Sequence, residues 1–302
     1  MSAPRITVIT PSYNQARFIE RTICSVLDQA YDNLEFIVID GGSTDGSDEI
    51  IRMYEQDLAC WSSTPDGGRC DAINEGLARA TGDIVTVLSG DAIYPPGVLD
   101  HVAQFSKQRD APMWLVGRCL QIDEFDDSIG AIEPSPPNSL ASYLMHDSGV
   151  LPASSTFFSR RCVAANGAFD PKLEYAFHYE YCCRLLSRGV SPTLVPIPLA
   201  AQREHSESRS ARCTLQEGLE TLDAALRYVE SLPLRQRYEL RANCDRRRRI
   251  YALAEAEVAG HQAKRFMLGE LIRHPWWLAD DMVRHTLAHG VGHPVPPELV
   301  AA

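Results

Sequence analysis

The sequence predicts an α/β fold in which a mostly parallel sheet carries helices on both faces, followed by a helical region. Short apolar runs rich in β-branched residues are typical of strands buried on both faces, and they occur at 6–9, 34–39 and 84–88. Segments with apolar residues at helical spacing separate these runs. From residue 214 onward the pattern is almost entirely helical. Because strands that alternate with helices pair in parallel, this order favours a sheet covered on both sides.

Length and composition are those of an ordinary globular protein. The chain has 302 residues, of which 45% are hydrophobic and 23% charged, and this excludes disordered, collagen-like and disulfide-scaffold proteins. At roughly 100–200 residues per domain, the length predicts one large domain with an appendage or two modest domains. We expect the α/β domain to span residues 1–210 and the helical region to span residues 211–302.

The negative charge is concentrated in the first part of the chain. The net charge is −11, with 26 acidic and 14 basic residues in 1–200 but 14 acidic and 15 basic in 201–302. This balance argues against nucleic acid as a partner. An anionic ligand of the first part would need a bound cation, or local arginines, histidines and helix N-termini, to offset the field of the protein.

Cysteine usage and the N-terminus predict a cytoplasmic protein. The nine cysteines are an odd number without a Cys-x-x-Cys pair, and Cys182 and Cys183 are adjacent, where a disulfide would be strained. The start, MSAPRITVIT, lacks the pattern of a secretory signal. No apolar run approaches the ~20 residues that span a bilayer.

The first strand and the first helix follow from local patterns. Residues 6–9 are β-branched, and Pro11 is expected to end that strand. Residues 15–29 carry apolar side chains at helical spacing, and Ser12 or Asn14 is available as the N-cap.

The next elements complete the alternation. Residues 34–39 are almost continuously apolar, and the GGSTDGS segment then ends the strand. Asp45 or Ser47 would cap a short helix after it. A helix at 71–80 and a strong strand at 84–88 follow. The less regular middle of the chain predicts a strand at 114–122, an acidic proline-rich loop at 123–139, a strand at 155–159, a helix at 174–187 and two short strands, 193–195 and 199–202, split by prolines.

Polar residues follow three of the predicted strands at the point where each strand ends. These clusters are residues 10–14 (TPSYN), 40–47 (DGGSTDGS) and 89–92 (SGDA). Ligands of open parallel sheets bind beyond the carboxyl ends of the strands, so the clusters predict a ligand site. Each cluster alone could equally be turn chemistry. A dinucleotide site is excluded, because the turn after the first strand contains no glycine.

Several ordered motifs resemble the GT-A-fold glycosyltransferases of family 2. The segments that carry the resemblance are 9–14 (ITPSYN), 29–31 (QAY), 35–47 (EFIVIDGGSTDGS), 65–77 (PDGGRCDAINEGL), 80–84 (ATGDI), 154–158 (SSTFF), 167–170 (GAFD) and 203–205 (REH). Together they cover roughly the first two-thirds of the chain. The resemblance implies a GT-A domain that binds a nucleotide-sugar donor, with a UDP-sugar favoured.

The resemblance also implies the donor-binding residues. They are Thr10, Pro11, Tyr13, Asp40, Ser43, Asp66, Arg69, Asp71, Asn74 and Gly90. A carboxylate suits a uracil N–H or ribose hydroxyls, and an arginine can neutralise a diphosphate. Asp71 could instead be a helix N-cap, and Asn74 could lie on a solvent face.

The metal site that the resemblance implies departs from the family pattern. The family usually has two acidic residues here, but this chain has Asp91 followed by Ala92. Because Mg²⁺ and Mn²⁺ prefer several oxygen ligands, we expect a weakened site formed by Asp91 and by His205. His205 could alternatively be an ordinary surface residue.

The general base is the second departure. The family places an acidic residue at the start of a helix, where this chain has His178, with Glu180 two residues later. Residues two apart do not share a helix face, so only one of them would face the acceptor. Histidine can serve as a base, but His178 could also pack beside Phe177 and Tyr179.

The resemblance implies an inverting transfer of a sugar to a hydroxyl of a glycan or lipid-linked acceptor, as in polysaccharide biosynthesis. The base would remove the acceptor proton while a cation, Arg69 or His205 stabilises the departing diphosphate. The alternative is a catalytically silent nucleotide-sugar-binding or scaffolding relative, which Ala92 and His178 favour. A nucleotidyltransferase would need paired metal carboxylates and a glycine-rich triphosphate loop, and neither is clear.

The helical region has three interpretations. The arginines at 246–249 and the RHPWW segment at 273–277 would suit peripheral contact with an anionic membrane surface. The interpretation that we favour is that the same residues form a charged helix with core tryptophans. The apolar stripes could also form a homodimer interface.

Overall fold

The computed structural model describes residues 3–106, 113–135, 137, 139–145, 151–205, 214–259 and 263–289. Its contacts divide the chain into two compact units, Met1–Arg212 and Cys213–Ala302. The expected boundary between residues 210 and 211 lies outside the described residues.

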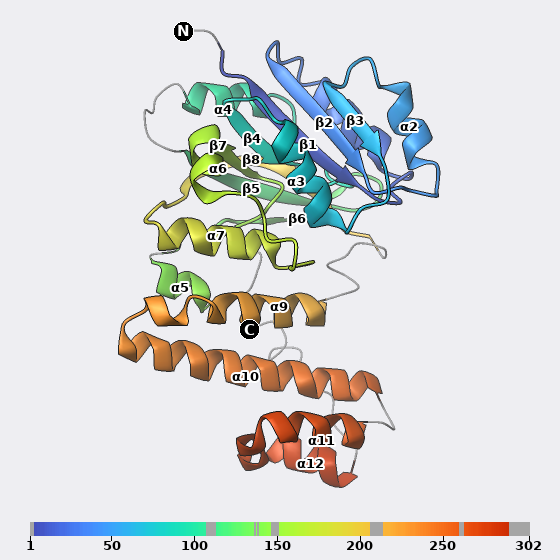
Figure 1. Ribbon diagram of the computed structural model, residues 1–302. Helices are drawn as coiled ribbons and strands as arrows, with labels where there is room; N and C mark the ends of the chain where they lie inside the picture. Colours follow the sequence, from blue (N-terminus) through green and yellow to red (C-terminus); the bar gives the residue numbers. More distant parts are fainter. Residues whose placement is uncertain are drawn as a thin grey trace. The chain divides into compact units, whose positions relative to one another are not determined.

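The first unit is built on one eight-stranded sheet (Figure 1). Its strands are β1 (Ile6–Ser12), β2 (Leu34–Asp40), β3 (Cys60–Ser63), β4 (Ile84–Val87), β5 (Trp114–Ile122), β6 (Ser128–Ile132), β7 (Thr156–Ser159) and β8 (Thr193–Arg203). The strand order is β3-β2-β1-β4-β7-β5-β6, and β8 pairs with β5. The pairs among β1 to β4 are parallel, as is β5–β8. β7 runs antiparallel to β4 and β5, which makes the sheet mixed.

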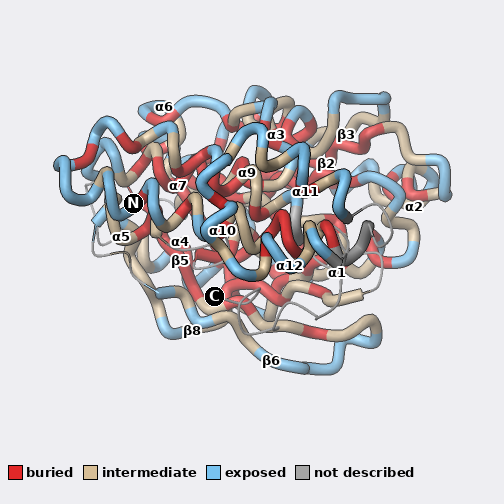
Figure 2. Tube along the Cα trace, turned by 90° about the horizontal axis from the view of Figure 1, so that it is seen from below, coloured by how far each residue is buried: buried red, intermediate tan, exposed pale blue. Residues whose placement is uncertain are grey.

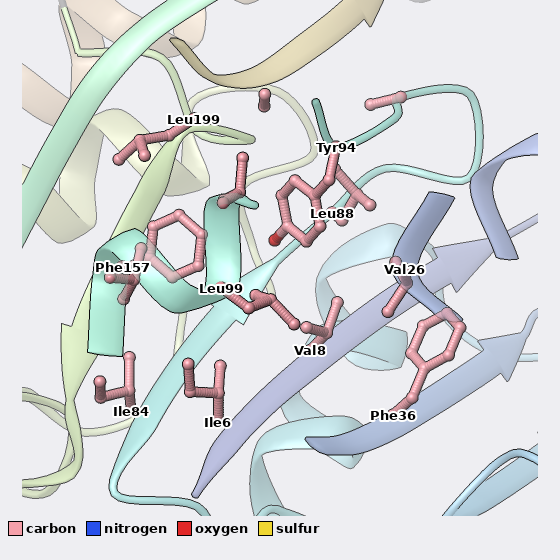
Figure 3. Close-up of a cluster of buried hydrophobic side chains, with 14 of the residues drawn as sticks. Ile6, Val8, Val26, Phe36, Ile84, Leu88, Tyr94, Leu99, Phe157 and Leu199 are labelled. Carbon is pink, nitrogen blue, oxygen red and sulfur yellow. The ribbon is translucent and has the colours of Figure 1, made fainter. Parts of the chain in front are cut away.

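Helices cover both faces of this sheet, as the alternating pattern predicts. The helices of the first unit are α1 (Ile19–Leu27), α2 (Ser47–Met53), α3 (Arg69–Arg79), α4 (Val98–Ser106), α5 (Leu140–Leu144), α6 (Arg160–Asn166) and α7 (Phe177–Ser187). α1, α2 and α4 pack on the face that carries Val8 and Phe36, and this core is drawn in Figure 3. α3 packs on the opposite face, against Ile9, Ile37 and Ile39.

β1 does not end at Pro11 but continues to Ser12. Along a strand, the N–H groups of alternate residues point to opposite neighbours. Ser12 bonds toward β2, through its carbonyl and the Gly41 N–H, so the nitrogen of Pro11 faces the β4 side. β4 pairs with β1 only as far as Ile9. The missing proline N–H therefore costs no ladder hydrogen bond.

The predicted start of the first helix is also wrong. α1 begins at Ile19, and its N-cap position, Phe18, makes no side-chain capping bond. Asn14 cannot cap it, because its backbone N–H and its side-chain oxygen both bind the loop after β2. Instead, the carbonyl of Gln15 accepts hydrogen bonds from the N–H groups of Phe18 and Ile19 at the start of the helix.

Two features of the middle differ from the sequence prediction. The expected loop at 123–139 contains β6, which pairs with β5. The segments 193–195 and 199–202 form one strand, β8, and irregular register accommodates its prolines. Strands 114–122 and 155–159 were predicted to within one residue at each end.

The second unit is helical. It contains α9 (Thr214–Leu226), η1 (Val229–Ser231), α10 (Leu234–Ala259), α11 (Ala263–Arg273), η3 (Pro275–Ala279) and α12 (Asp281–His289). Its own core includes Leu253, Ala256, Met267, Trp277 and Val283. The first half of α10 is mostly exposed, which Figure 2 shows in pale blue. Across the described residues, no helix is both long and apolar enough for a membrane span.

The arginine run of α10 does not form one charged face. Arg247 is buried, whereas Arg246 is exposed. Arg248 pairs with Asp223, and Arg249 pairs with Asp280 at 3.1 Å. Successive residues of a helix point about 100° apart, so four consecutive arginines cannot share a face.

Candidate functional site

The loops after β1 and β2 are joined by hydrogen bonds at the carboxyl ends of these strands. The backbone N–H of Asn14 donates to the Ser43 hydroxyl at 2.8 Å, and the Asn14 side chain accepts from the Thr44 N–H at 2.9 Å. The N–H of Gln15 donates to the Ser47 hydroxyl at 2.8 Å. The first two polar clusters therefore form one surface, on which Tyr13 is 60% exposed.

The third cluster packs against the first. A Cβ at Gly90 would lie 3.3 Å from the Pro11 carbonyl oxygen, so both residues are buried in close backbone contact. The Thr22 hydroxyl donates to the carbonyls of Gly90 and Ala92 and fixes this loop on α1. The side chain of Ala92 is buried in the core. The convergence of the three strand ends, expected from topology, is therefore present in the backbone.

Asp40 is not presented to a ligand in this structure. Its carboxylate is fully buried and accepts hydrogen bonds from the Gly42 and Ser43 N–H groups and from the Ser43 and Ser63 hydroxyls. Side-chain alternation directs Thr10 and Ser12 to the face covered by α1, and both side chains are buried. Asp40 holds the loop together, and Thr10 lies behind the site rather than on its surface.

Asp66 is the carboxylate that reaches the end of β2. A Cβ on Gly41 would lie 3.1 Å from Asp66 Oδ1, so the Asp66 carboxylate lies directly against the Gly41 backbone. Asp66 is exposed and accepts from the Gly68 N–H at 2.8 Å, just before α3 begins. Desolvation raises its pKa, with further contributions from the nearby carboxylates Asp71 and Asp40.

Arg69, Ser89, Asp91 and His205 form the charged centre of the site. Arg69, the first residue of α3, donates to the Ser89 hydroxyl after β4. His205 Nε2 lies 3.3 Å from Asp91 Oδ2. Although burial opposes ionisation, His205, Arg69 and Ser89 together hold the pKa of Asp91 below its usual value. His205 is not an ordinary surface residue, because its side chain is buried.

Arg203 and Asp126 support this centre and were not singled out from the sequence. Arg203 is fully buried over the Phe18 ring, and it pairs with Asp126 in the turn between β5 and β6. Its guanidinium also lies 3.4 Å from the Asp91 carbonyl. The His205 ring packs on the same Phe18 at 4.6 Å. The only sequence signal was the position of Arg203 two residues before His205.

Asn74 connects α3 to the loop before α7. Its amide makes two hydrogen bonds to the backbone of Phe169, both at 2.9 Å. Phe169 stacks on Tyr181 of α7 at 4.2 Å. Asn74 is therefore neither a solvent-face residue nor a side chain open to a donor. Asp71 lies exposed in the first turn of α3, whose N-cap position is Gly68.

His178 and Glu180 point to different sides of α7. Glu180 is buried and pairs with Arg184 at 2.8 Å. Burial and the carboxylates of Asp71, Asp170 and Glu180 raise the pKa of the Cys70 thiol to about 12. Arg184, the partner of Glu180, also donates to the Ala168 carbonyl at 3.0 Å, next to the Phe169 backbone that Asn74 of α3 binds. The His178 ring instead lies 3.8 Å from Cys182, and burial lowers its pKa to about 4.

Comparison with known sequences identifies the family. Residues 7–160 match the family described as glycosyl transferase family 2, which is just over half of the chain. The chain belongs to glycosyl transferase family 2. An uncharacterized glycosyltransferase of Mycobacterium tuberculosis is 35% identical over 189 residues, which cover 61% of this chain and 69% of that protein.

Solved structures share the GT-A fold of this family 2 glycosyltransferase. S. aureus TarS 1–349, in complex with UDP-GlcNAc, superposes with a TM-score of 0.61 at 16% identity, over 85% of this chain and 72% of that one. The mannosyltransferase PcManGT from Pyrobaculum calidifontis, in complex with GDP-Man and Mn²⁺, gives 0.55 at 21% identity, over 100% and 86%. These likenesses establish the fold alone.

The side chains of this glycosyltransferase offer few ligands to a divalent metal ion. Among the described residues, no group of three or more His, Cys, Asp or Glu side chains could hold a metal ion. Asp91 and His205 are the two side chains that could bind a metal ion here, because Ala92 contributes only a buried methyl group. Two ligands suffice for Mg²⁺ or Mn²⁺ only when substrate phosphates complete the coordination.

Proposed function

We propose that this glycosyltransferase moves a sugar from a nucleotide-sugar donor to a hydroxyl of a glycan or lipid-linked acceptor, with inversion. The observation that carries the proposal is the gathering of Arg69, Ser89, Asp91 and His205 where β4 ends and α3 begins. Arg69 brings a positive charge to this centre, in the more acidic part of the chain, and an anionic diphosphate requires such a local cation.

The donor would lie across the surface formed by the three strand ends. Arg69 would bind the diphosphate, and the exposed Asp66 would accept a hydrogen bond from the base or ribose. Tyr13 and the backbone around Ser43 would border the nucleoside, while Pro11 and Gly90 shape the floor. A UDP-sugar is the first candidate, because the TarS structure was solved with UDP-GlcNAc.

A divalent cation would be held by Asp91 and His205 together with the donor's diphosphate. Bound there, Mn²⁺ or Mg²⁺ would neutralise charge that builds on the departing nucleotide. Arg69 neutralises part of the same charge from the protein side. We therefore expect metal to bind weakly without nucleotide and to strengthen donor binding when both are present.

Glu180 is the better candidate for the general base. Through Arg184 it adjoins the segment around Phe169 that contacts α3, whereas the His178 ring contacts Cys182 on another side of α7. A histidine with a pKa of about 4 is a weak base near neutral pH. Glu180 would take the proton from the acceptor hydroxyl as the hydroxyl oxygen bonds to the anomeric carbon and displaces the nucleoside diphosphate in line. The transition state would be oxocarbenium-like.

A panel of nucleotide sugars tests the proposal directly. We expect at least one UDP- or GDP-linked sugar to raise the melting temperature, since a ligand at 100 times its Kd adds about 2.7 kcal/mol to the unfolding free energy. Each sugar is tested with and without Mn²⁺ or Mg²⁺. If no member at millimolar concentration shifts the transition, the chain is not a nucleotide-sugar-dependent enzyme.

A turnover measurement distinguishes an active glycosyltransferase from a catalytically silent relative that only binds the nucleotide sugar. Ala92 and the pairing of Glu180 with Arg184 favour that alternative. With the donor that binds, the wild type is expected to transfer or hydrolyse the sugar, and Glu180→Gln to lower kcat by about 10²–10⁴ with little change in donor affinity. His178→Gln serves as the matched control. Donor binding without turnover in the wild type would support the silent alternative.

A further inference from the structure

An exposed apolar stripe runs along the second unit and has no role in the proposed reaction. Leu268 is 57% exposed, Ile272 85% and Trp276 57%, and they follow one another at intervals of four residues through α11 and η3. Leu268 and Ile272 therefore share a helix face. We call Leu268, Ile272 and Trp276 the α11 stripe.

The inner side of α11 is apolar as well, so the stripe is not a misplaced core face. Met267 is fully buried, and Phe266 and Leu271 pack against the core of the second unit. A surface helix normally carries polar residues opposite its buried side. α11 instead exposes a leucine and an isoleucine there. Contiguous exposed apolar side chains of this kind mark a contact surface.

Positive charge flanks the stripe. Between Ala263 and Ala279, three cations (Lys264, Arg265 and Arg273) and Glu270 give a net charge of +2, in a chain of net charge −11. One carboxylate from α10, that of Asp245, accepts from the Trp276 indole N–H at 3.0 Å. α11 has no acidic residue in its first turn, where the helix dipole would favour one, and carries Lys264 and Arg265 there instead. Arg265 is exposed and forms no ion pair with any described residue. Arg273 lies in the last turn and pairs with Glu270, and Lys264 donates to the Ala288 carbonyl at 2.7 Å, so Arg265 is the cation that helix stability does not explain.

We propose that the α11 stripe docks this protein on an anionic lipid bilayer. Leucine, isoleucine and tryptophan side chains would enter the interface while the flanking cations bind lipid phosphates. In a symmetric contact with a second copy the same cationic surface would face itself, so like charges would approach one another. The surface differs from the one expected from sequence, because Trp277 is core and the arginines at 246–249 are dispersed. The proposal is independent of the donor site.

Vesicle sedimentation of the full-length chain tests this docking. The probes are vesicles of phosphatidylcholine alone and of phosphatidylcholine mixed equally with phosphatidylglycerol. We expect binding to the mixed vesicles, weakened by added salt. The double variant Leu268→Gln, Ile272→Gln should lose at least about tenfold in partitioning, because two apolar side chains no longer insert. Arg265→Gln should lose about fivefold.

Leu234→Gln is the matched control, because Leu234 is 71% exposed in the same unit but lies outside the stripe. It should bind vesicles as the wild type does. Absence of binding to both vesicle types would overturn the proposal, as would an equal loss in the Leu234 variant. A wild-type dimer in light scattering that the double variant converts to monomer would assign the stripe to a second copy instead. Melting temperatures and nucleotide-induced shifts of the same samples report separately on folding and on the donor site.

Discussion

At the scale of single residues, Arg69 is the cation best placed to bind a diphosphate. It stands at the first position of α3 and donates to Ser89, next to Asp91. We expect Arg69→Gln to weaken binding of the selected nucleoside diphosphate by roughly tenfold to a hundredfold, the value of a charge-assisted hydrogen bond. Binding of the corresponding nucleoside should change little. Isothermal titration with both ligands measures the difference.

Arg79→Gln is the control for this prediction. Arg79 lies at the other end of the same helix, where it pairs with Glu75. The substitution removes one positive charge from α3 but leaves the site untouched, so the affinity for diphosphate should stay unchanged. An equal loss in both variants would mean that overall charge, rather than a contact from Arg69, governs the affinity.

His178 predicts a specific dependence of stability on pH. Its pKa is about 4 in the folded protein because of burial, below the ordinary value of 6.5. Between these values the unfolded chain binds the proton more tightly, so stability present above about pH 6.5 is lost as the pH falls. The wild type should therefore lose more of its melting temperature between pH 7 and about pH 5 than His178→Gln does. His101→Gln, at an exposed position, should behave as the wild type.

The sequence predicted the residues of the charged centre, but it did not predict what the Asp40 carboxylate contacts. Arg69, Asp91 and His205, expected from separate motifs, meet in space. Asp40 was also expected at the donor site, but its carboxylate accepts hydrogen bonds from Gly42, Ser43 and Ser63 instead. Whether a carboxylate faces a ligand or its own backbone depends on strand alternation and on the neighbouring Ser63, which the local sequence does not reveal.

At the scale of elements, the turn between β5 and β6 holds Arg203 in place. Asp126 has a φ of 75° and pairs with both Arg21 and Arg203. Asp126→Asn should destabilise the protein by about 2 kcal/mol, because the buried guanidinium of Arg203 loses its carboxylate. Asparagine tolerates the left-handed backbone as aspartate does, so the charge alone is tested. Urea unfolding gives the free energy.

Asp127→Asn provides the comparison, since Asp127 is the next residue of the turn and is exposed. Its substitution should change the free energy of unfolding by less than about 0.5 kcal/mol. Equal stabilities of the two variants would show that Arg203 does not depend on Asp126.

Elements were predictable where the local pattern is strong. The apolar runs at 34–39 and 114–122 became β2 and β5 almost residue for residue. β6 was missed because its sequence, SIGAI, is short, partly exposed and follows an acidic turn. The antiparallel position of β7 between β4 and β5 was also absent from the local signal, since strand neighbours are set by long-range packing.

At the scale of the whole molecule, the two units have separate cores and separate proposed tasks. The residues expected at the donor site, from Thr10 to His205, all lie in Met1–Arg212, and the α11 stripe lies in Cys213–Ala302. The uneven charge follows the same division. The acidic first unit would need local cations for an anionic donor, as its composition implies, and Arg69 supplies one at the charged centre.

This division predicts the behaviour of a fragment. Residues 1–212 contain the matched family segment and a complete sheet with helices on both faces. The fragment should unfold cooperatively and bind the selected nucleotide within about threefold of the full-length affinity, a difference below about 1 kcal/mol. It should also fail to sediment with anionic vesicles. Calorimetry and the vesicle assay measure both properties, and a folded fragment that binds no nucleotide would mean that residues 213–302 contribute to the donor site.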